Sequence, residues 1–343
     1  MHQLKCCKSY VYPPPIANHP LHILCCTDAL YAAYCGVTAT SVLESCKDTS
    51  VAVHIITDGI KDRDKELFGI LAKTYGASID ITTIPAPILE NLAHNQGRWP
   101  RSICFRLLAP DLLPDEINRI IYLDCDIIAN TDLRRLWTTD MAGYAIAAVS
   151  DIDRCTDAAL TGMLSALREL PQSRRYFNSG VMLMDLAQMR QTRVHDKMLR
   201  LIYEAGDALP YPDQDALNLI LHGQWKRLPC EWNLMPWALV KSNQTELTAE
   251  EQYSVTETAI GHPRGIIHFY GPYHPWDCRS LIFHPMEHLW EHYRRMSPWR
   301  HSIRRIHPSH IMTRFHRQRL RMCWKLKIPT VYDTPWIDIP RRS

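Results

Sequence analysis

Two aspartates interrupt an apolar, β-prone stretch of the chain, "IIYLDCDIIANTDL" at residues 120–133. Residues two apart in a strand point to the same face, so the carboxylates of Asp124 and Asp126 would lie side by side while Cys125 points the other way. Unpaired carboxylates each lose roughly several kcal/mol of hydration when they are buried. The spacing therefore predicts either the open end of a strand or a cation held between the two side chains. The alternative is a pair of surface turn carboxylates that cap the following "TDLRRLW".

A histidine in a second apolar run is a candidate third ligand. His268 lies in "IIHFYG" and is the best placed of the 17 histidines because its neighbours are apolar. Carboxylates suit Mg²⁺ or Mn²⁺, and an added imidazole favours Mn²⁺. The alternative is a core histidine that is hydrogen-bonded to the backbone. The sequence contains neither G-x-G-x-x-G nor a P-loop, so phosphate binding through a glycine-rich turn is not indicated.

The elements that must position these side chains alternate along the chain. Apolar, β-prone runs predict strands at residues 21–27, 51–58, 78–84, 119–126, 144–151, 177–186 and 265–271. Amphipathic stretches predict helices at residues 31–46, 62–76, 101–113 and 156–170 and another that ends near residue 204, before "DQDALNLIL" at 213–221. This order predicts an α/β fold with a mostly parallel sheet and helices on both faces. Ligands bind beyond the carboxyl ends of such strands, which is where Asp28, Asp124 and Asp126 fall.

Length and composition favour one sizeable domain. The chain has 343 residues, of which 46% are hydrophobic, and its apolar runs are far shorter than the roughly 18 residues of a membrane-spanning helix. Residues 1–20 lack an apolar signal segment, so we expect a short leader and a cytoplasmic protein. The twelve cysteines include no C-x-x-C pair, which favours reduced thiols over a disulfide framework or a cysteine metal site.

Charge is distributed unevenly along the chain. Residues 291–327 contain eleven Lys or Arg and one acidic residue, a net charge of +10, whereas the whole chain carries +3. The same segment contains the apolar residues Trp299, Ile303, Ile306, Ile311, Met312, Phe315, Leu320 and Trp324. This pattern favours an element that lies on an anionic membrane surface, with a solvated basic helix as the alternative. Because the rest of the chain is net acidic, a nucleic-acid partner is not expected.

Four motifs occur in a characteristic order. They are "YLDCDIIANTDL", "YFNSGVMLMDL", "PDQDALNLI" and "HFYGPYHPW", and "SPW" follows at residues 297–299. Over about residues 21–300 this pattern resembles the family 8 glycosyltransferases, in particular the bacterial lipopolysaccharide core glucosyl- and galactosyltransferases. The resemblance implies a Rossmann-like GT-A fold, a UDP-hexose donor, a divalent metal and retention of anomeric configuration.

The same resemblance implies roles for individual residues. Asp124, Asp126 and His268 would bind the metal, with Asp124 and Cys125 also in the donor-binding stretch. Asp28 would contact the uracil or ribose, and Arg106 the donor. The remaining positions are Asn178 and Ser179 in the sugar pocket, the catalytic candidates Asp213 and Gln214 beside the anomeric carbon, and Gly271, whose N–H would face the diphosphate. Both a covalent intermediate and front-face departure of the nucleotide are compatible with these residue types.

Two positions depart from the family pattern. His274 stands in "GPYHPW" where the family usually has a lysine that contacts the diphosphate, so donor affinity is expected to be weaker and dependent on pH. Leu30 stands where an asparagine is common, which removes one polar contact to the nucleoside. Neither change affects the three predicted metal ligands.

The pattern as a whole predicts a three-part chain and one activity. Residues 1–20 would form a leader, 21–285 the GT-A catalytic domain, and 286–343 a helical, basic and aromatic extension that associates with the membrane. The expected activity is transfer of glucose or galactose from a UDP-sugar to a lipopolysaccharide core at the inner face of the cytoplasmic membrane. The alternatives are a protein or soluble glycan acceptor, and a non-catalytic UDP-sugar-binding or scaffold protein.

Overall fold

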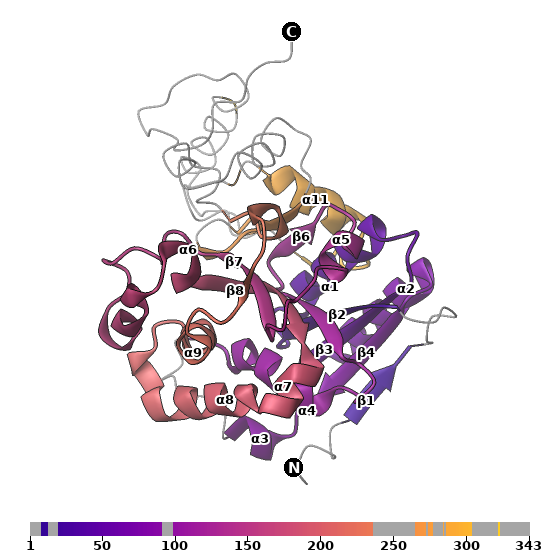
Figure 1. The fold of residues 1–343 in the computed structure, drawn as a ribbon. Helices are drawn as coiled ribbons and strands as arrows, with labels where there is room; N and C mark the ends of the chain where they lie inside the picture. Colours follow the sequence, from indigo (N-terminus) through magenta and orange to yellow (C-terminus); the bar gives the residue numbers. More distant parts are fainter. Residues whose placement is uncertain are drawn as a thin grey trace, which may run out of the picture.

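The computed structural model describes residues 8–12, 20–90, 99–235, 265–271, 274–276, 284, 286–303 and 322. An eight-stranded sheet runs through the middle of the molecule in the order β1-β4-β3-β2-β5-β8-β7-β9, and β6 and β10 form a separate two-stranded sheet (Figure 1). The strands are β1 Lys8–Val11, β2 Leu21–Thr27, β3 Val51–Thr57, β4 Ser78–Thr83, β5 Arg119–Leu123, β6 Ile127–Ala129, β7 Ile146–Ser150, β8 Phe177–Asp185, β9 Lys226–Arg227 and β10 Ile266–His268.

Most strands of the large sheet run in one direction. Strands β4, β3, β2 and β5 are parallel neighbours, and β7 and β9 run the same way. Strand β8 is antiparallel to both β5 and β7, and β1 is antiparallel to β4 at the edge. The predicted mixed α/β fold with a mostly parallel central sheet is therefore confirmed.

Helices cover both faces of this sheet (Figure 1). The α-helices are α1 Ala32–Ser45, α2 Asp62–Tyr75, α3 Ala86–Glu90, α4 Ala109–Leu112, α5 Arg134–Trp137, α6 Gln172–Arg175, α7 Leu186–Thr192, α8 Val194–Ala205, α9 Pro212–Leu221 and α11 Glu287–Met296. The 3₁₀ helices are η2 Arg101–Leu108, η3 Gly162–Glu169, η4 Gly206–Ala208 and η5 Cys230–Trp232. Alternate residues of β2 enter different cores, because Ile23 packs in the cluster under α1, α2 and α11, and Leu24 packs in the cluster under η2, α8 and α9.

Two predicted helices and one strand end differ from the expectation. The helix predicted at 101–113 is a 3₁₀ helix over Arg101–Leu108 followed by the short α4, and Pro110 in the first turn of α4 cannot donate to the carbonyl four residues earlier. The helix predicted at 156–170 begins only at Gly162, whose φ of +55° interrupts a right-handed helix. Strand β5 ends at Leu123, so Asp124 and Asp126 lie in the turn before β6 and not within a strand.

The described part of the predicted C-terminal extension packs into the core. Trp299 is fully buried, and its ring lies against Gly36 of α1 so closely that a Cβ on this glycine would be 2.3 Å from the ring. Its indole N–H donates a hydrogen bond to Asp64 at 2.8 Å. Ile303 is also buried. The expectation that these two side chains lie on a membrane is therefore wrong, and the other six apolar residues of that segment lie outside the described residues.

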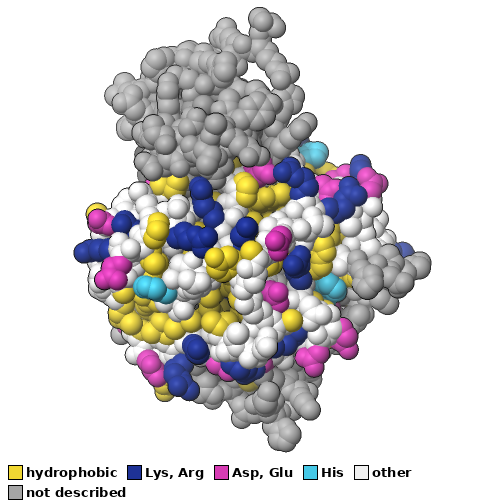
Figure 2. Space-filling view, in the orientation of Figure 1, with side chains coloured by type: hydrophobic (Ala, Val, Ile, Leu, Met, Phe, Trp, Pro, Cys, Tyr) yellow, Lys and Arg dark blue, Asp and Glu magenta, His cyan; other side chains and the backbone are white. Residues whose placement is uncertain are grey.

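The described surface shows no long basic stretch on the face drawn in Figure 2, where Lys and Arg side chains are interspersed with Asp and Glu. Among the described residues, no helix combines the length and the apolar character needed to cross a bilayer. Strand β1 lies within the predicted leader and pairs with β4. Beyond Ile303, the predicted extension lies outside the described residues except for Met322.

Candidate active site

A cavity of about 710 Å³ opens where the parallel strands end. Eleven of the twelve predicted site residues line it: Arg106, Asp124, Cys125, Asp126, Asn178, Ser179, Asp213, Gln214, His268, Gly271 and His274. The reversed direction of β8 explains how residues from that strand reach the same edge. Its first residues, Asn178 and Ser179, lie where β5 has already ended, and the N–H of Asp124 donates to the carbonyl of Gly180 at 2.8 Å.

The three predicted metal ligands converge at this edge. Each offers one ligand atom, and these atoms all lie within 4.8 Å of one another. His268 Nε2 is 3.2 Å from Asp126 Oδ1 and 3.9 Å from Asp124 Oδ2. Antiparallel pairing of β10 with β6 sets this geometry, because His268 is in register with Ile127 and Phe269 N–H donates to the carbonyl of Asp126 at 2.9 Å.

An amide chain fixes the orientation of the His268 ring. His268 Nδ1 is 2.9 Å from Asn233 Oδ1, and Asn233 Nδ2 donates to Asn178 Oδ1 at 2.9 Å. An amide oxygen only accepts, so Nδ1 carries a proton and Nε2 is the ring nitrogen that faces the two carboxylates. A ring held in this way by a second polar group is typical of metal-binding histidines.

Opposite charges in the cluster perturb one another. Burial raises the pKa of the Asp126 carboxyl, but the imidazoles of His268 and His274 outweigh it and hold this pKa well below its usual range. Burial lowers the pKa of His268, but the carboxylates of Asp126 and Asp124 outweigh it and the pKa is raised. The arrangement therefore favours an ionised Asp126 carboxylate beside a positively charged partner.

Asp124 is anchored by a buried arginine and a buried tyrosine. Arg106 Nη2 contacts Asp124 Oδ1 at 2.9 Å, and the hydroxyl of Tyr122 donates to the same oxygen at 2.5 Å. The guanidinium lies 4.1 Å from the centre of the Tyr122 ring. With Oδ1 occupied, Oδ2 is the oxygen of Asp124 that faces His268.

The two catalytic candidates lie beside the same arginine. Asp213 Oδ2 is 3.3 Å from Arg106 Nε, and burial raises the pKa of Asp213 although Arg106 opposes this. Gln214 Oε1 accepts a hydrogen bond from the N–H of Ser179 at 2.9 Å, and Gln214 Nε2 donates to the hydroxyl of Tyr176 at 3.2 Å. The amide of Gln214 is thus held in one orientation at the cavity wall.

Of the three remaining predicted residues, Gly271 and His274 line the cavity and Asp28 does not. Asp28 is the one that does not line the cavity; its Oδ1 accepts from the N–H groups of Leu30 and Tyr31 at 2.8 and 2.9 Å and closes the turn before α1. Its predicted contact with the nucleoside therefore stays a prediction. Gly271 adopts φ +68°, and His274 Nε2 lies 3.3 Å from Asp126 Oδ2.

Sequence reasoning missed several residues of this site, among them Tyr122, Asp151, Gly180 and Asn233. Tyr122 could have been found, since it precedes Asp124 by two residues and points to the same side. Gly180 is explained by space, because a Cβ there would be 2.3 Å from His268 Cε1 and 2.9 Å from Asp124 Oδ2. Asp151 is the last residue of the predicted strand at 144–151 and could have been suspected, but no local signal marks Asn233.

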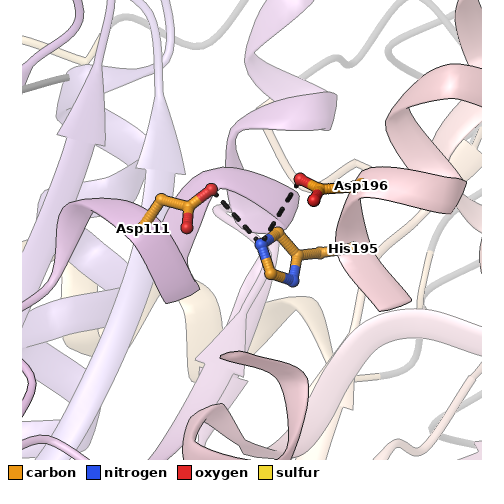
Figure 3. Close-up of side chains that lie close together, drawn as sticks. All are labelled: Asp111, His195 and Asp196. Carbon is orange, nitrogen blue, oxygen red and sulfur yellow. Dashed lines mark hydrogen bonds and ion pairs between the residues drawn. The ribbon is translucent and has the colours of Figure 1, made fainter. Parts of the chain in front are cut away.

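A second histidine and carboxylate cluster has a different character. Figure 3 shows the carboxylates of Asp111 and Asp196 on either side of the His195 ring, at 3.2 and 3.7 Å from Nε2. Both carboxylates are already paired with Arg193, each at 2.6 Å. The cluster therefore joins α4 to α8 as an ion-pair network, and the arginine occupies the place that a cation would need.

Comparison with solved structures identifies the fold. The galactosyltransferase LgtC, solved with donor and acceptor sugar analogues, aligns with a TM-score of 0.66 at 22% identity over 82% of this chain and 99% of that one. The bifunctional glycosyltransferase WbbM aligns with a TM-score of 0.67 at 17% identity, over 85% of this chain and 52% of that one. The protein has the GT-A fold of these glycosyltransferases.

The sequence comparison then gives the family. The model of glycosyl transferase family 8 matches residues 22–279, and the chain belongs to this family. General stress protein A of Bacillus subtilis is 31% identical over 81% of this chain and 94% of its own length. Lipopolysaccharide 1,2-glucosyltransferase of Escherichia coli K12 is 28% identical over 80% and 77%, and lipopolysaccharide 1,3-galactosyltransferase of Salmonella typhimurium is 26% identical over 78% and 75%.

Proposed function

We propose that this protein is a retaining, metal-dependent hexosyltransferase that moves glucose or galactose from a UDP-sugar to a lipopolysaccharide core oligosaccharide. The observation that carries the proposal is the convergence of Asp124, Asp126 and His268 on one edge of a cavity that also holds the buried pair Arg106 and Asp213. Membership of family 8 supports retention, and the names of the Escherichia coli and Salmonella relatives support the donor and acceptor classes.

The donor set fits a divalent metal of the Mn²⁺ or Mg²⁺ type. Asp124 Oδ2, Asp126 Oδ1 and His268 Nε2 would hold it. Gly180 has no Cβ, which leaves room for His268 and Asp124 to lie next to each other. A bound divalent ion would neutralise the negative charge that develops on the departing UDP diphosphate.

Side chains of the cavity wall would position the donor and stabilise the charge that develops on its sugar. Arg106 holds Asp124 and Asp213 in fixed positions by ion pairs within the cavity wall. Asp213 and the oriented amide of Gln214 provide polar, partly negative surroundings for a sugar that becomes positively charged at its anomeric carbon. Gly271 and His274 line the same cavity, and His274 also contacts Asp126, so both would be available to a diphosphate bound there.

The test is metal-dependent turnover of UDP-glucose and UDP-galactose with truncated lipopolysaccharide cores as acceptors. Asp126→Asn should lower kcat/KM by about 100-fold or more, because it removes one charged ligand. Asp132→Asn is the matched control, since Asp132 lies six residues away, contacts Arg134 and does not line the cavity. Normal transfer by a folded Asp126→Asn variant would contradict the metal assignment, and metal-dependent UDP binding without any turnover would favour a binding protein.

We further propose that the enzyme works at the inner face of the cytoplasmic membrane. The net charge of +10 over residues 291–327 supports attraction to anionic lipid. Within the described part of this segment, Arg294 and Arg295 are both paired with Glu291. We therefore assign the attraction to the exposed Arg300 and to the basic residues that follow Ile303.

A further inference from the structure

The two carboxylate oxygens of Asp126 face different imidazole rings. Oδ1 is 3.2 Å from Nε2 of His268, and Oδ2 is 3.3 Å from Nε2 of His274. Asp126 and His274 both line the cavity, with side chains that are 16% and 22% exposed. The metal contacts proposed above use Oδ1, so the contact between Oδ2 and His274 needs a separate explanation.

The contact with His274 has a defined direction. The pKa of Asp126 is held well below its usual range, so this group is an ionised carboxylate, which can only accept hydrogen bonds. Nε2 of His274 therefore carries a proton and donates a hydrogen bond to Oδ2, whether the ring is neutral or charged. A protonated ring nitrogen has no lone pair for a metal, so His274 does not add a further ligand through this atom.

Aromatic packing holds the His274 ring beside Asp126. The ring stacks on the indole of Trp276, with the ring centres 4.7 Å apart and the planes 13° from parallel. Trp276 is 4% exposed, and its ring stacks with Tyr34 of α1 at 4.3 Å and packs against Trp290 of α11 at 5.3 Å. Because these rings belong to the core, the orientation of His274 is set before any ligand enters the cavity.

The two aspartates of the cluster are held in the same way. In Asp124, donors of the cavity wall occupy Oδ1, and Oδ2 faces His268. In Asp126, His274 occupies Oδ2, and Oδ1 faces His268. Each carboxylate is thus held through one oxygen and offers the other. A carboxylate without such a donor is free to rotate about its Cβ–Cγ bond, so the donor selects one geometry for metal binding.

We propose that His274 is a positioning residue of the metal site, whose Nε2–H holds Oδ2 of Asp126 so that this aspartate presents Oδ1 to the metal. The inference rests on the proposed function, because it concerns the metal of that reaction. A diphosphate bound in the cavity would compete with Asp126 for the same N–H. The two roles are separable, because a positioning residue acts on metal binding before any nucleotide is present.

The experiment measures the Mn²⁺ affinity of the full-length protein without nucleotide, by electron paramagnetic resonance of free Mn²⁺. His274→Ala should weaken Mn²⁺ binding about tenfold, as is usual when a group that orients a metal ligand is lost. His274→Gln should keep the affinity within about threefold, because its amide N–H can take the place of Nε2–H. His274→Asn should lose as much as His274→Ala, because its shorter amide reaches only the position of Nδ1.

His292→Ala is the matched control. His292 is an exposed histidine that packs edge-on against another aromatic ring, that of Tyr293, with the ring centres 5.1 Å apart, and it does not line the cavity. This variant should bind Mn²⁺ as tightly as the unmodified protein. Thermal unfolding of every variant shows whether a loss of Mn²⁺ affinity accompanies a loss of the fold.

Two results would overturn the inference. If folded His274→Ala binds Mn²⁺ normally without nucleotide and loses only affinity for UDP, His274 serves the diphosphate. If His274→Gln and His274→Asn lose Mn²⁺ affinity equally, the loss follows from the missing ring and not from the N–H. Failure of the proposed function is distinguishable from both, because the unmodified protein would then consume neither UDP-glucose nor UDP-galactose in the presence of Mn²⁺, whereas the His274 variants are compared by Mn²⁺ and UDP binding.

Discussion

The two carboxylate oxygens of Asp124 have separate partners. Oδ1 accepts from Arg106 and Tyr122, and Oδ2 faces His268. An aspartate held in this way can give a metal only one oxygen, and its orientation is set before the metal arrives. Under the proposed function, Tyr122 is therefore a positioning residue, which would act on a bound metal through Asp124.

Removing the hydroxyl of Tyr122 tests this role. Tyr122→Phe should weaken Mn²⁺ binding about tenfold, as is usual when a group that orients a metal ligand is lost. Electron paramagnetic resonance of free Mn²⁺ during titration measures the affinity without relying on catalysis. The matched control is Tyr75→Phe, which removes another tyrosine hydroxyl bonded to a carboxylate, that of Glu44 at 3.1 Å, outside the cavity. Equal Mn²⁺ affinity in Tyr122→Phe and the unmodified protein would show that Arg106 alone orients Asp124.

The sequence predicts which side chains gather at the candidate site better than it predicts the hydrogen bonds that orient them. Asp124, Asp126 and His268 stand out because charged or basic groups interrupt apolar runs, and their motifs match a family pattern. The orienting partner of His268 was not predictable, because Asn233 lies 35 residues away in an unremarkable segment and meets His268 only through tertiary packing. Asp28 also lies at the end of a strand, but its carboxylate accepts hydrogen bonds from the backbone N–H groups of Leu30 and Tyr31 in the turn that follows. A position at a strand end therefore does not by itself show that a carboxylate faces the cavity.

Strand β8 is the element on which the site depends most. Its reversed direction brings its first residues to the edge where β5 and β7 end, and Gly180 lets His268 and Asp124 approach its backbone. The alternation of apolar and polar stretches predicted the strand itself. Its direction was not predictable from that pattern, because hydrophobic periodicity is the same in parallel and antiparallel strands when both faces are buried.

Gly180→Ala tests the close approach at β8. The added methyl group must displace His268 or Asp124, so Mn²⁺ affinity should fall about tenfold or more. Gly36→Ala is matched to it, because a Cβ at that position also meets a ring at 2.3 Å, that of Trp299 in the core. This control should lower the free energy of unfolding by about 1–3 kcal/mol and leave the Mn²⁺ affinity of the folded protein unchanged. Denaturant titration measures the free energy of unfolding and paramagnetic resonance the Mn²⁺ affinity of each variant. A folded Gly180→Ala variant with unchanged Mn²⁺ affinity would contradict the prediction.

For the molecule as a whole, the first residues of the predicted C-terminal extension pack with the main core, and the predicted domain boundary stays a prediction. Composition marks residue 286, but α11, Trp299 and Ile303 pack with the main core. An amphipathic, basic stretch has the same composition whether its apolar side meets lipid or protein, so packing decides between the two. The fold class, by contrast, followed directly from the alternation of strands and helices.

Two truncations separate the structural part of this segment from its proposed membrane part. Removal of residues 304–343 should abolish sedimentation with anionic vesicles, because most of the basic residues of the segment are lost, and leave the unfolding midpoint unchanged. Removal of residues 297–343 also deletes Trp299 and should cost about 3–5 kcal/mol of folding free energy. Vesicle sedimentation and thermal unfolding measured on both chains decide the matter, and vesicle binding that survives the shorter deletion would place the membrane contact elsewhere.

The contact between Trp299 and Gly36 also has a consequence for how the protein is made. The ribosome releases α1 long before the indole that covers it and the imidazole of His268, because more than 200 residues separate α1 from both side chains. Contacts between such distant positions cannot form until both partners have left the exit tunnel, and closing them is slow. A nascent chain therefore carries an incomplete α1 interface until Trp299 has emerged, and the cluster of Asp124 and Asp126 lacks its imidazole until His268 has emerged.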